Sequence, residues 1–228
     1  MLFSGAAGEL EGLWKEAAGP RRGAAVFAHP HPLHGGTMHN KVVYRAVQAL
    51  TQSGFATLRF QFRGVGLSKG RYDAGRGEVD DVRSALDEAE ARAGHGVALV
   101  AGGFSFGAAM ALKASDGDPR VAAFIGLGLP VSTESGRMLP RPPADRPALF
   151  LVGERDAYGP PDDLARFLQG APWVRRVVIP GADHFFEGQL EEVASEVRAF
   201  LESLSLPSTT AAAAGGVAGD AGGGGKAS

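Results

Sequence analysis

The sequence predicts an α/β fold, a three-layer αβα sandwich with a mostly parallel central sheet. Six apolar runs recur along the chain, and most of them lack the alternation of a half-exposed strand, so they are typical of strands buried on both faces. Segments with the apolar spacing of helices lie between these runs. The chain has 228 residues, which is enough for one well-filled core and too few for two ordinary domains.

The first expected element is an antiparallel hairpin at one edge of the sheet, within residues 2–14, which are interrupted by three glycines. The expected buried strands then follow at residues 24–28, 56–62, 97–101, 121–127, 148–152 and 174–179. Helical spacing is found at residues 42–50, 79–89 and 190–204, and a segment of small residues at 108–112 also reads as a helix. Because strands and helices alternate, we expect helices on both faces of a parallel sheet.

Two segments set the limits of this domain. Only about 20 residues, several of them proline, connect the strands at 121–127 and 148–152, so we expect no cap domain over the sheet and an open cleft instead. Residues 207–228 are rich in alanine and glycine and offer little to bury. We therefore assign residues 1–206 to the folded domain and expect 207–228 to be a disordered tail with no catalytic role.

Composition narrows the function classes. The formal net charge is −2, and the basic residues are scattered along the sequence, so we expect no nucleic-acid partner. There is no cysteine, which excludes disulfides, thiolate metal sites and a cysteine nucleophile, and is consistent with a reducing compartment. We find neither a secretory signal in residues 1–14 nor an apolar stretch of membrane-spanning length. We therefore expect a soluble cytoplasmic protein.

The candidate nucleophile is Ser105. An apolar run at 97–101 leads into Gly103-Phe104-Ser105-Phe106-Gly107, and a helix-like segment follows. The Gly-X-Ser-X-Gly pattern needs its glycines because the serine occupies a strained strand-to-helix turn, where a Cβ two residues to either side would clash. A second match, around Ser68, has no strand before it and no helix after it, so we interpret Ser68 as a loop residue.

A serine hydroxyl needs a base within hydrogen-bond reach and an acid that orients the base. In the order Ser, acid, His that accompanies this type of turn, the acid follows a later strand. Asp156 follows the run at 148–152 and is our candidate, with Glu154 as the next choice. Asp162 and Asp163 precede residues 164–168 and read as a helix N-cap.

The candidate base is His184. It follows the last expected strand, at 174–179, and precedes the final helix. An isolated histidine is more often a structural residue. Here the serine turn, an acid after one later strand and a histidine after the next occur in the required order, so we predict that Ser105, Asp156 and His184 form a catalytic triad.

Acyl transfer also requires N–H donors for the oxyanion. The amide of Phe106, which follows the nucleophile, is the expected first donor. The second is expected in the loop after the strand at 24–28, where Pro30 and Pro32 have no N–H. The choice lies between His31 and Leu33, and we favour the backbone of His31.

The same loop supports a rival hypothesis. His29, His31 and His34 have the H-x-H-x-x-H spacing of a metallo-hydrolase site. Against a metal, Leu33 stands where such a motif often carries aspartate, and distal ligands would have to come from His95, His184 or carboxylates. We therefore expect no metal and no cofactor. We expect His29 to fix the loop and His34 and His39 to line the mouth of the site, although a purely structural role explains each of them equally well.

With these residues in view, the chain resembles the α/β-hydrolase superfamily, and within it small cap-less bacterial hydrolases similar to dienelactone-hydrolase-like carboxylesterases. The resemblance covers residues 1 to about 205. It rests on HPHPLHGGTMHNKVV (29–43), RFQFRGVGLSKG (59–70), GGFSFG (102–107), GERD (153–156) and GADHFF (181–186).

The resemblance implies the α/β-hydrolase fold, an oxyanion loop, a structural arginine-glycine turn that contains Ser68, and the same triad. Two departures argue against transferring a named substrate from these relatives. Dienelactone hydrolases have a cysteine nucleophile, which is absent here. Many relatives have an apolar residue before the proline in the turn that here reads Ala157-Tyr158-Gly159-Pro160. The predicted function is a serine esterase that cleaves small to medium soluble carboxylic esters. The alternatives are a thioesterase or other acyl hydrolase with the same triad, a metal-dependent hydrolase, or a binding module that retains only the fold. The expected partner is a small-molecule ester, and the oligomeric state is left open.

Overall fold

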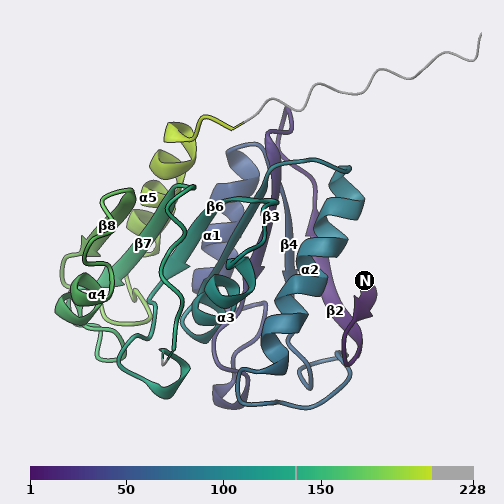
Figure 1. Ribbon diagram of the computed structural model, residues 1–228, viewed down its shortest axis with the longest axis horizontal. Coiled ribbons are helices and arrows are strands. Elements are labelled where there is room, and N and C mark those ends of the chain that lie inside the picture. The colour runs from purple at the N-terminus through teal and green to yellow at the C-terminus, as the bar shows by residue number, and fades with distance from the viewer. Residues whose placement is uncertain (137, 207–228) are drawn as a thin grey trace, which may run out of the picture.

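The computed structural model describes residues 1–136 and 138–206, so the tail predicted at 207–228 lies outside the described residues. Eight strands form one sheet in the order β1-β2-β4-β3-β5-β6-β7-β8 (Figure 1). The strands are β1 Leu2–Gly5, β2 Gly8–Lys15, β3 Gly23–Ala28, β4 Phe55–Phe60, β5 Leu99–Phe104, β6 Val121–Leu127, β7 Ala148–Gly153 and β8 Val174–Ile179. The predicted α/β sandwich with a mostly parallel sheet is confirmed.

The N-terminal hairpin is also found as predicted. Strands β1 and β2 pair antiparallel, and β2 pairs antiparallel with β4, so the hairpin extends one edge of the sheet. All pairings from β4 to β8 are parallel. The carboxyl ends of β5, β7 and β8 therefore lie along one rim of the sheet, where ligands bind in folds of this kind.

Helices cover both faces of the sheet (Figure 1). Helices α1 and α5 pack against each other on one face, and α2 and α3 do so on the other face, where α4 also lies. Their bounds are α1 Lys41–Gln52, α2 Gly77–Ala93, α3 Phe106–Ser115, α4 Pro161–Phe167 and α5 Leu190–Ser203. The start of α1 is set by Asn40, whose side-chain oxygen accepts hydrogen bonds from the amides of Val42 and Val43.

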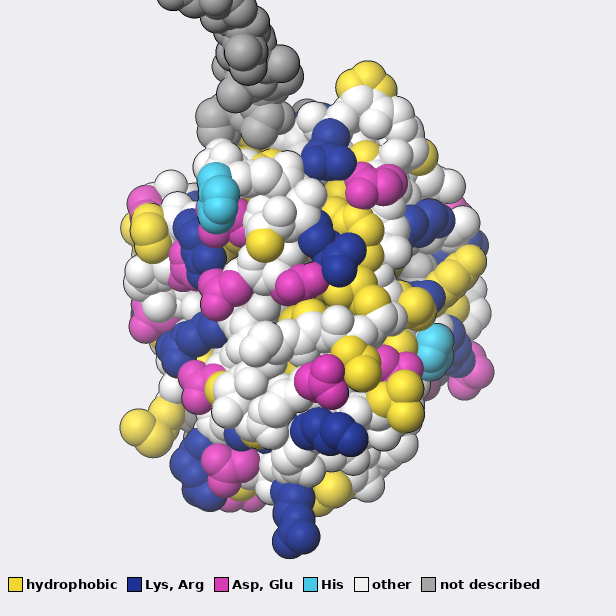
Figure 2. Space-filling model, turned by 90° about the vertical axis from the view of Figure 1, so that its right-hand side faces the viewer, with side chains coloured by type: hydrophobic (Ala, Val, Ile, Leu, Met, Phe, Trp, Pro, Cys, Tyr) yellow, Lys and Arg dark blue, Asp and Glu magenta, His cyan; other side chains and the backbone are white. Residues whose placement is uncertain are grey.

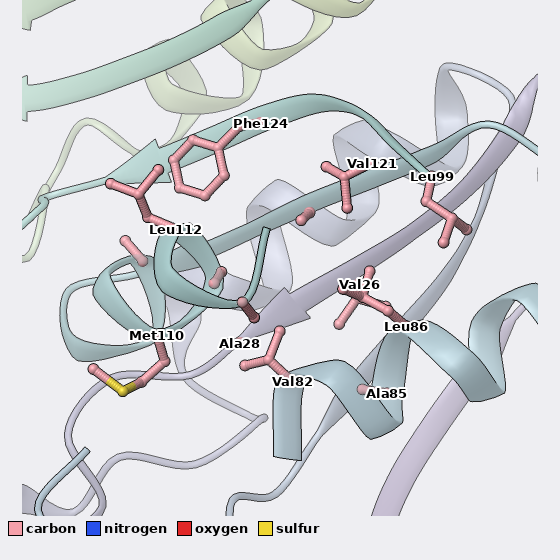
Figure 3. Close-up of a cluster of buried hydrophobic side chains, with 14 of the residues drawn as sticks. Val26, Ala28, Val82, Ala85, Leu86, Leu99, Met110, Leu112, Val121 and Phe124 are labelled. Carbon is pink, nitrogen blue, oxygen red and sulfur yellow. The ribbon is translucent and has the colours of Figure 1, made fainter. Parts of the chain in front are cut away.

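Each face of the sheet has its own hydrophobic core. On the face of α2 and α3, Val26 and Leu99 from the sheet meet Val82 and Leu86 of α2 (Figure 3). On the other face, side chains of α1 and α5 cover alternate residues of the same strands. Because both faces are covered, the central strands are buried along nearly their whole length, as the continuous apolar runs predict.

Three local predictions need correction. The edge strand β8 is only partly buried, with Arg175 and Arg176 exposed, because it has a neighbour on one side only. Strand β5 begins at Leu99 and continues through Gly102 and Gly103, because these glycines still pair with β3 and β6. The N-cap of α4 is Pro160, so the predicted capping pair, Asp162 and Asp163, lies in the first helical turn instead.

The connection between β6 and β7 spans residues 128–147 and contains one short 3-10 helix, Glu134–Gly136, among its described residues. It carries no cap domain over the part of the sheet that the structure describes. None of the described helices has the length and apolar character required to cross a membrane. On the face formed by the hairpin and α2, basic and acidic side chains are interspersed (Figure 2).

Candidate active site

Ser105 lies in the turn between β5 and α3. Its backbone has φ 55° and ψ −121°, a left-handed conformation that is strained for a residue with a side chain. The Ser105 amide donates a hydrogen bond to the Leu127 carbonyl of β6 at 2.8 Å, which holds the turn against the sheet. The hydroxyl is thereby presented at the sheet rim and at the N-terminus of α3.

The glycines that flank Ser105 allow the close approach that the sequence predicts. A Cβ on Gly103 would lie 2.4 Å from the carbonyl carbon of Gly107. A Cβ on Gly107 would lie 2.4 Å from the carbonyl oxygen of Ala28. These distances are far below van der Waals contact, so β5, α3 and the end of β3 can pack together only when both positions are glycine.

The three predicted residues lie together in one hydrogen-bond chain. His184 Nε2 is 2.8 Å from Ser105 Oγ, and His184 Nδ1 is 2.8 Å from Asp156 Oδ2. Because a carboxylate only accepts, Nδ1 carries the imidazole proton, which leaves Nε2 as the acceptor for the serine hydroxyl. Asp156 and His184 are both buried.

The carboxylate of Asp156 is oriented by the backbone that follows it. Its Oδ1 accepts hydrogen bonds from the amides of Tyr158, at 2.8 Å, and Gly159, at 3.1 Å, which leaves Oδ2 for His184. Glu154, the alternative acid, accepts instead from the Gly181 amide at 2.7 Å and is exposed. The geometry therefore favours Asp156 over Glu154 as the partner of the imidazole.

Aromatic side chains enclose the His184 ring. Its centroid lies 4.5 Å from Tyr158, 5.2 Å from Phe104 and 5.3 Å from Phe185. A Cβ on Gly128 would come within 3.1 Å of the ring, so the imidazole is packed on that side as well. Sequence reasoning assigned no contact to Tyr158 or Gly128, because neither belongs to a motif and only the folded chain brings them to His184.

The two predicted oxyanion donors come from different segments: His31 lies in the loop after β3, and Phe106 is the first residue of α3. The Leu33 amide is already occupied, because it donates to His31 Nδ1 at 3.2 Å. Within the described residues, the amides of His31 and Phe106 donate to no protein acceptor. A Cβ on Gly36 would lie 2.1 Å from the Pro30 carbonyl oxygen, so the loop folds back tightly on itself.

The His31 ring is held in one tautomer. Since Nδ1 accepts from Leu33, Nε2 carries the proton, and it donates to the Tyr72 hydroxyl at 3.1 Å. Burial lowers the pKa of His31, and the nearby His34 ring, stacked at a centroid distance of 4.3 Å, adds to this effect. The neutral ring thus supports the loop whose amide is the candidate oxyanion donor.

His29 has a structural position, which argues against the metal hypothesis. Its Nε2 accepts from the Phe62 amide at 3.1 Å, and its Nδ1 donates to the Pro30 carbonyl at 2.6 Å. Burial lowers the pKa of His29 to about 4. With both ring nitrogens bound to backbone, His29 has no lone pair for a metal, and the described residues contain no group of three or more potential ligands. His34 lines the cleft as predicted, whereas His39 does not.

The arginine-glycine turn is a structural element. The Ser68 hydroxyl is buried, donates to the Gln61 carbonyl at 2.7 Å and accepts from the Glu11 amide at 2.9 Å, so it joins the turn to β2. Arg63 forms a buried ion pair with Asp81 of α2 at 2.7 Å. Ser68 is therefore a loop residue, as its sequence context indicates.

Ser105 opens into a cleft of about 480 Å³. Its walls are the loop after β3, the segment around Tyr72, helix α3 and the segment that follows β6. The lining residues are His31, Leu33, His34, Tyr72, Ala74, Gly75, Ser105, Phe106, Met110, Lys113, Pro130, Thr133, Glu134, Ser135 and Tyr158.

Comparisons with known proteins agree with this architecture. An uncharacterized protein of Rickettsia prowazekii (strain Madrid E) is 34% identical over 211 residues, which cover 88% of this chain and 87% of that protein. The structure of an alpha-beta serine hydrolase homologue from Coxiella burnetii is 37% identical, with a TM-score of 0.80 and coverage of 87% of this chain and 95% of the other.

A serine hydrolase without a lid from Xanthomonas campestris is 29% identical, with a TM-score of 0.82. The alignment covers 92% of this chain and 95% of the Xanthomonas chain. The family model described as "Alpha/beta hydrolase domain" matches residues 21–204, which include the whole hydrogen-bond chain of Ser105, His184 and Asp156. The protein therefore belongs to the alpha/beta hydrolase family.

Proposed function

We propose that this alpha/beta hydrolase is a serine esterase that cleaves small to medium carboxylic esters through an acyl-enzyme on Ser105. The observation that supports the proposal is the continuous chain from Asp156 to His184 to Ser105, with 2.8 Å at each step. In this chain the proton of the imidazole is on Nδ1, so Nε2 is free to accept the proton of the Ser105 hydroxyl. The binding partner that we propose is a small-molecule ester. The compartment that we propose, from the composition of the sequence, is the cytoplasm.

In the first step, His184 Nε2 takes the hydroxyl proton while Ser105 Oγ attacks the ester carbonyl. The resulting imidazolium is stabilised by Asp156, and it returns the proton to the leaving alcohol. Water then attacks the acyl-enzyme, with His184 as the base, and Ser105 is released. The two backbone amides that donate to Asp156 Oδ1 hold the carboxylate in its orientation toward His184 throughout.

The amides of His31 and Phe106 are the proposed oxyanion donors. Both residues line the cleft together with Ser105, and their N–H groups lack a protein acceptor among the described residues, so these groups are free to donate when charge develops on the carbonyl oxygen. Loss of one such donor typically lowers turnover by about 10²- to 10³-fold.

The size of the cleft supports small or medium substrates. Its volume of about 480 Å³ lies within the range of small-molecule sites, about 300–1,000 Å³. No cap covers the described part of the sheet rim, so a soluble ester has direct access to Ser105. Thioesters of the same acyl groups use identical chemistry, and paired ester and thioester substrates separate the two activities.

The test is covalent labelling combined with turnover. A fluorophosphonate is expected to modify the wild-type protein at Ser105, and 4-nitrophenyl butyrate is expected to be hydrolysed. Ser105→Ala should remove the label and lower kcat by about 10⁴-fold or more, because the nucleophile is lost while the binding groups stay.

Ser84→Ala is the matched control. The Ser84 hydroxyl on α2 donates to the Asp80 carbonyl at 2.9 Å and does not line the cleft, so labelling and turnover should persist. The proposal is wrong if Ser105→Ala keeps near wild-type turnover, or if the wild-type protein neither accepts the label nor cleaves an ester or a thioester.

A further inference from the structure

Helix α3 forms one wall of the cleft with three side chains of different chemistry. Phe106, Met110 and Lys113 are spaced by four and three residues, so they lie on one face of the helix, and all three line the cleft. Leu112 points toward Phe124 in the core, whereas Met110 points away from it (Figure 3). The wall therefore starts beside Ser105, continues over apolar side chains and ends at an ammonium group.

Lys113 has no counter-ion among the described residues. It is half-buried, and within residues 1–136 and 138–206 no carboxylate forms a salt bridge with it. Burial is the cause that lowers its pKa. A partly desolvated ammonium with no partner is costly, and an anion bound in the cleft would offset this cost.

Among the described residues that line the cleft, Glu134 is the one that carries a carboxylate. Its side chain is exposed on the segment that follows β6, and its charge contributes to raising the pKa of Tyr72, so it acts on the side of the cleft near Tyr72. Because charges in water are screened, an exposed carboxylate at the rim repels an anion weakly. Direct contact with Lys113 is the stronger effect.

We propose that the cleft selects esters that carry a second, anionic group such as a carboxylate, and that Lys113 binds this group. The proposal rests on the proposed esterase function at Ser105 and names its substrate class. Phe106 and Met110, which are 2% and 0% exposed, would form the apolar backing of the wall along which the spacer between the two ends of the substrate lies. Lys113 is thus a specificity-determining residue, and it takes no part in the proton transfers.

The helix sets the spacing between the ester and the anion. Lys113 lies seven residues after Phe106, which corresponds to about 10 Å along the helix axis. Because helical side chains lean toward the N-terminus, the distance from the ester at Ser105 to the Lys113 ammonium group is roughly 5 to 10 Å. A six- or eight-carbon dicarboxylic monoester spans this distance, whereas a four-carbon one is too short.

The experiment compares kcat/KM for 4-nitrophenyl monoesters of succinic, adipic and suberic acids with the uncharged acetate, butyrate and hexanoate. A second arm uses acetate esters of ω-hydroxy acids, which place the carboxylate on the alcohol side. Wild-type protein should prefer the adipic or suberic monoester, or the matching ω-hydroxy ester, over the uncharged esters by roughly 10-fold. This preference should decrease as salt is raised.

Lys113→Met should abolish the preference, because it removes the charge and keeps an apolar chain of similar length. Lys113→Arg should retain most of the preference. Lys41→Met is the matched control, since Lys41 pairs with Glu187 outside the cleft, and the preference should be unchanged.

Three outcomes overturn the inference: no preference for a carboxylate in wild-type protein, a preference that survives Lys113→Met, or a preference equally strong for succinate. In each of these cases continued cleavage of uncharged esters and labelling of Ser105 leave the esterase proposal standing. If no ester is cleaved and Ser105 is not labelled, both proposals fail together.

Discussion

At the residue scale, the direction of the Asp156–His184–Ser105 chain depends on backbone amides. Tyr158 and Gly159 donate to one oxygen of Asp156, so the other oxygen faces the imidazole and selects the tautomer with the proton on Nδ1. The function that we propose for Ser105 requires this tautomer, because only a bare Nε2 accepts the hydroxyl proton.

Exchange of Asp156 tests this dependence. In Asp156→Asn, the amide can donate to Nδ1 and place the proton on Nε2, so kcat should decrease by about 10⁴-fold with little change in fold. Glu154→Gln is the control, because Glu154 contacts only the exposed Gly181 amide, and kcat should change by no more than a few-fold. Ester hydrolysis by both variants is the measurement. A larger loss in Glu154→Gln than in Asp156→Asn would make Glu154 the acid.

His29 links stability to pH. Burial lowers its pKa to about 4 in the folded protein, whereas the unfolded chain has the ordinary value of 6.5. Between these two values the unfolded state binds more protons, so the free energy of unfolding rises with pH. The stabilisation by neutral His29 is therefore fully present above pH 6.5 and is lost as the pH falls toward 4. The free energy of unfolding should differ by roughly 2 kcal/mol between pH 7.5 and pH 5 for this reason.

Urea unfolding at pH 7.5 and pH 5 measures this effect. His29→Gln should remove roughly 2 kcal/mol of the difference between the two pH values, although it also lowers stability at pH 7.5. His95→Gln should keep the difference, because the His95 side chain is 92% exposed. NMR titration of the His29 ring gives an independent value, and an ordinary pKa near 6.5 would refute the prediction.

At the element scale, α2 is joined to the turn after β4 by polar groups as well as by its apolar face. Asp81 accepts from the Arg63 side chain and backbone amide, and Glu78 accepts from the amides of Asp73 and Gly75. Both carboxylates are buried. The segment around Tyr72, which forms one wall of the cleft, is therefore held by the start of α2.

Removal of one member of the buried pair should be strongly destabilising. Asp81→Ala leaves the Arg63 guanidinium and amide without partners and should lower the free energy of unfolding by about 3–5 kcal/mol. Arg83→Ala on the same helix breaks the exposed pair with Asp80 and should cost about 0.5 kcal/mol or less. Urea denaturation compares the two variants. Equal losses would show that the buried pair has no special role.

In the molecule as a whole, Ser105 lies at an open rim of the sheet, and we propose that this openness sets the range of substrates. Residues 128–147 connect β6 to β7 without a cap domain over the described part of the sheet, and the Xanthomonas campestris hydrolase of similar structure also lacks a lid. Among the described residues, the cleft is bounded by α3 and by connecting segments that include the short 3-10 helices Pro32–His34 and Glu134–Gly136. Access to Ser105 thus requires no opening of a domain within residues 1–136 and 138–206.

Chain length and physical state of the substrate test this view. Among uncharged 4-nitrophenyl esters, turnover should be highest for the short and medium chains of acetate, butyrate and hexanoate, and should decrease for the palmitate, whose chain exceeds the cleft of about 480 Å³. Hydrolysis of tributyrin should follow its dissolved concentration, with no increase when emulsion droplets form. Preference for palmitate, or activation at the droplet surface, would contradict the prediction.

Much of the fold could be predicted because its signals are local. Continuous apolar runs indicate strands that are covered on both sides, and the order Ser, Asp, His after successive strands indicates which side chains reach the same rim. The partial exposure of β8 and the extent of β5 could not be predicted, since they depend on which strand is at the edge and on pairing across Gly102 and Gly103. The catalytic roles of Ser105, Asp156 and His184 stay predictions until activity is measured.

The fold class, the serine turn and the three candidate residues can be recognised from the chain alone, because they depend on patterns within short segments and on chain order. The folded protein was needed to show that both ring nitrogens of His29 bind backbone groups, that Asp156 and not Glu154 contacts His184, and that Lys113 shares a cleft with Ser105. Hydrogen bonding and burial depend on atoms from distant segments, and these atoms meet only when the chain is folded.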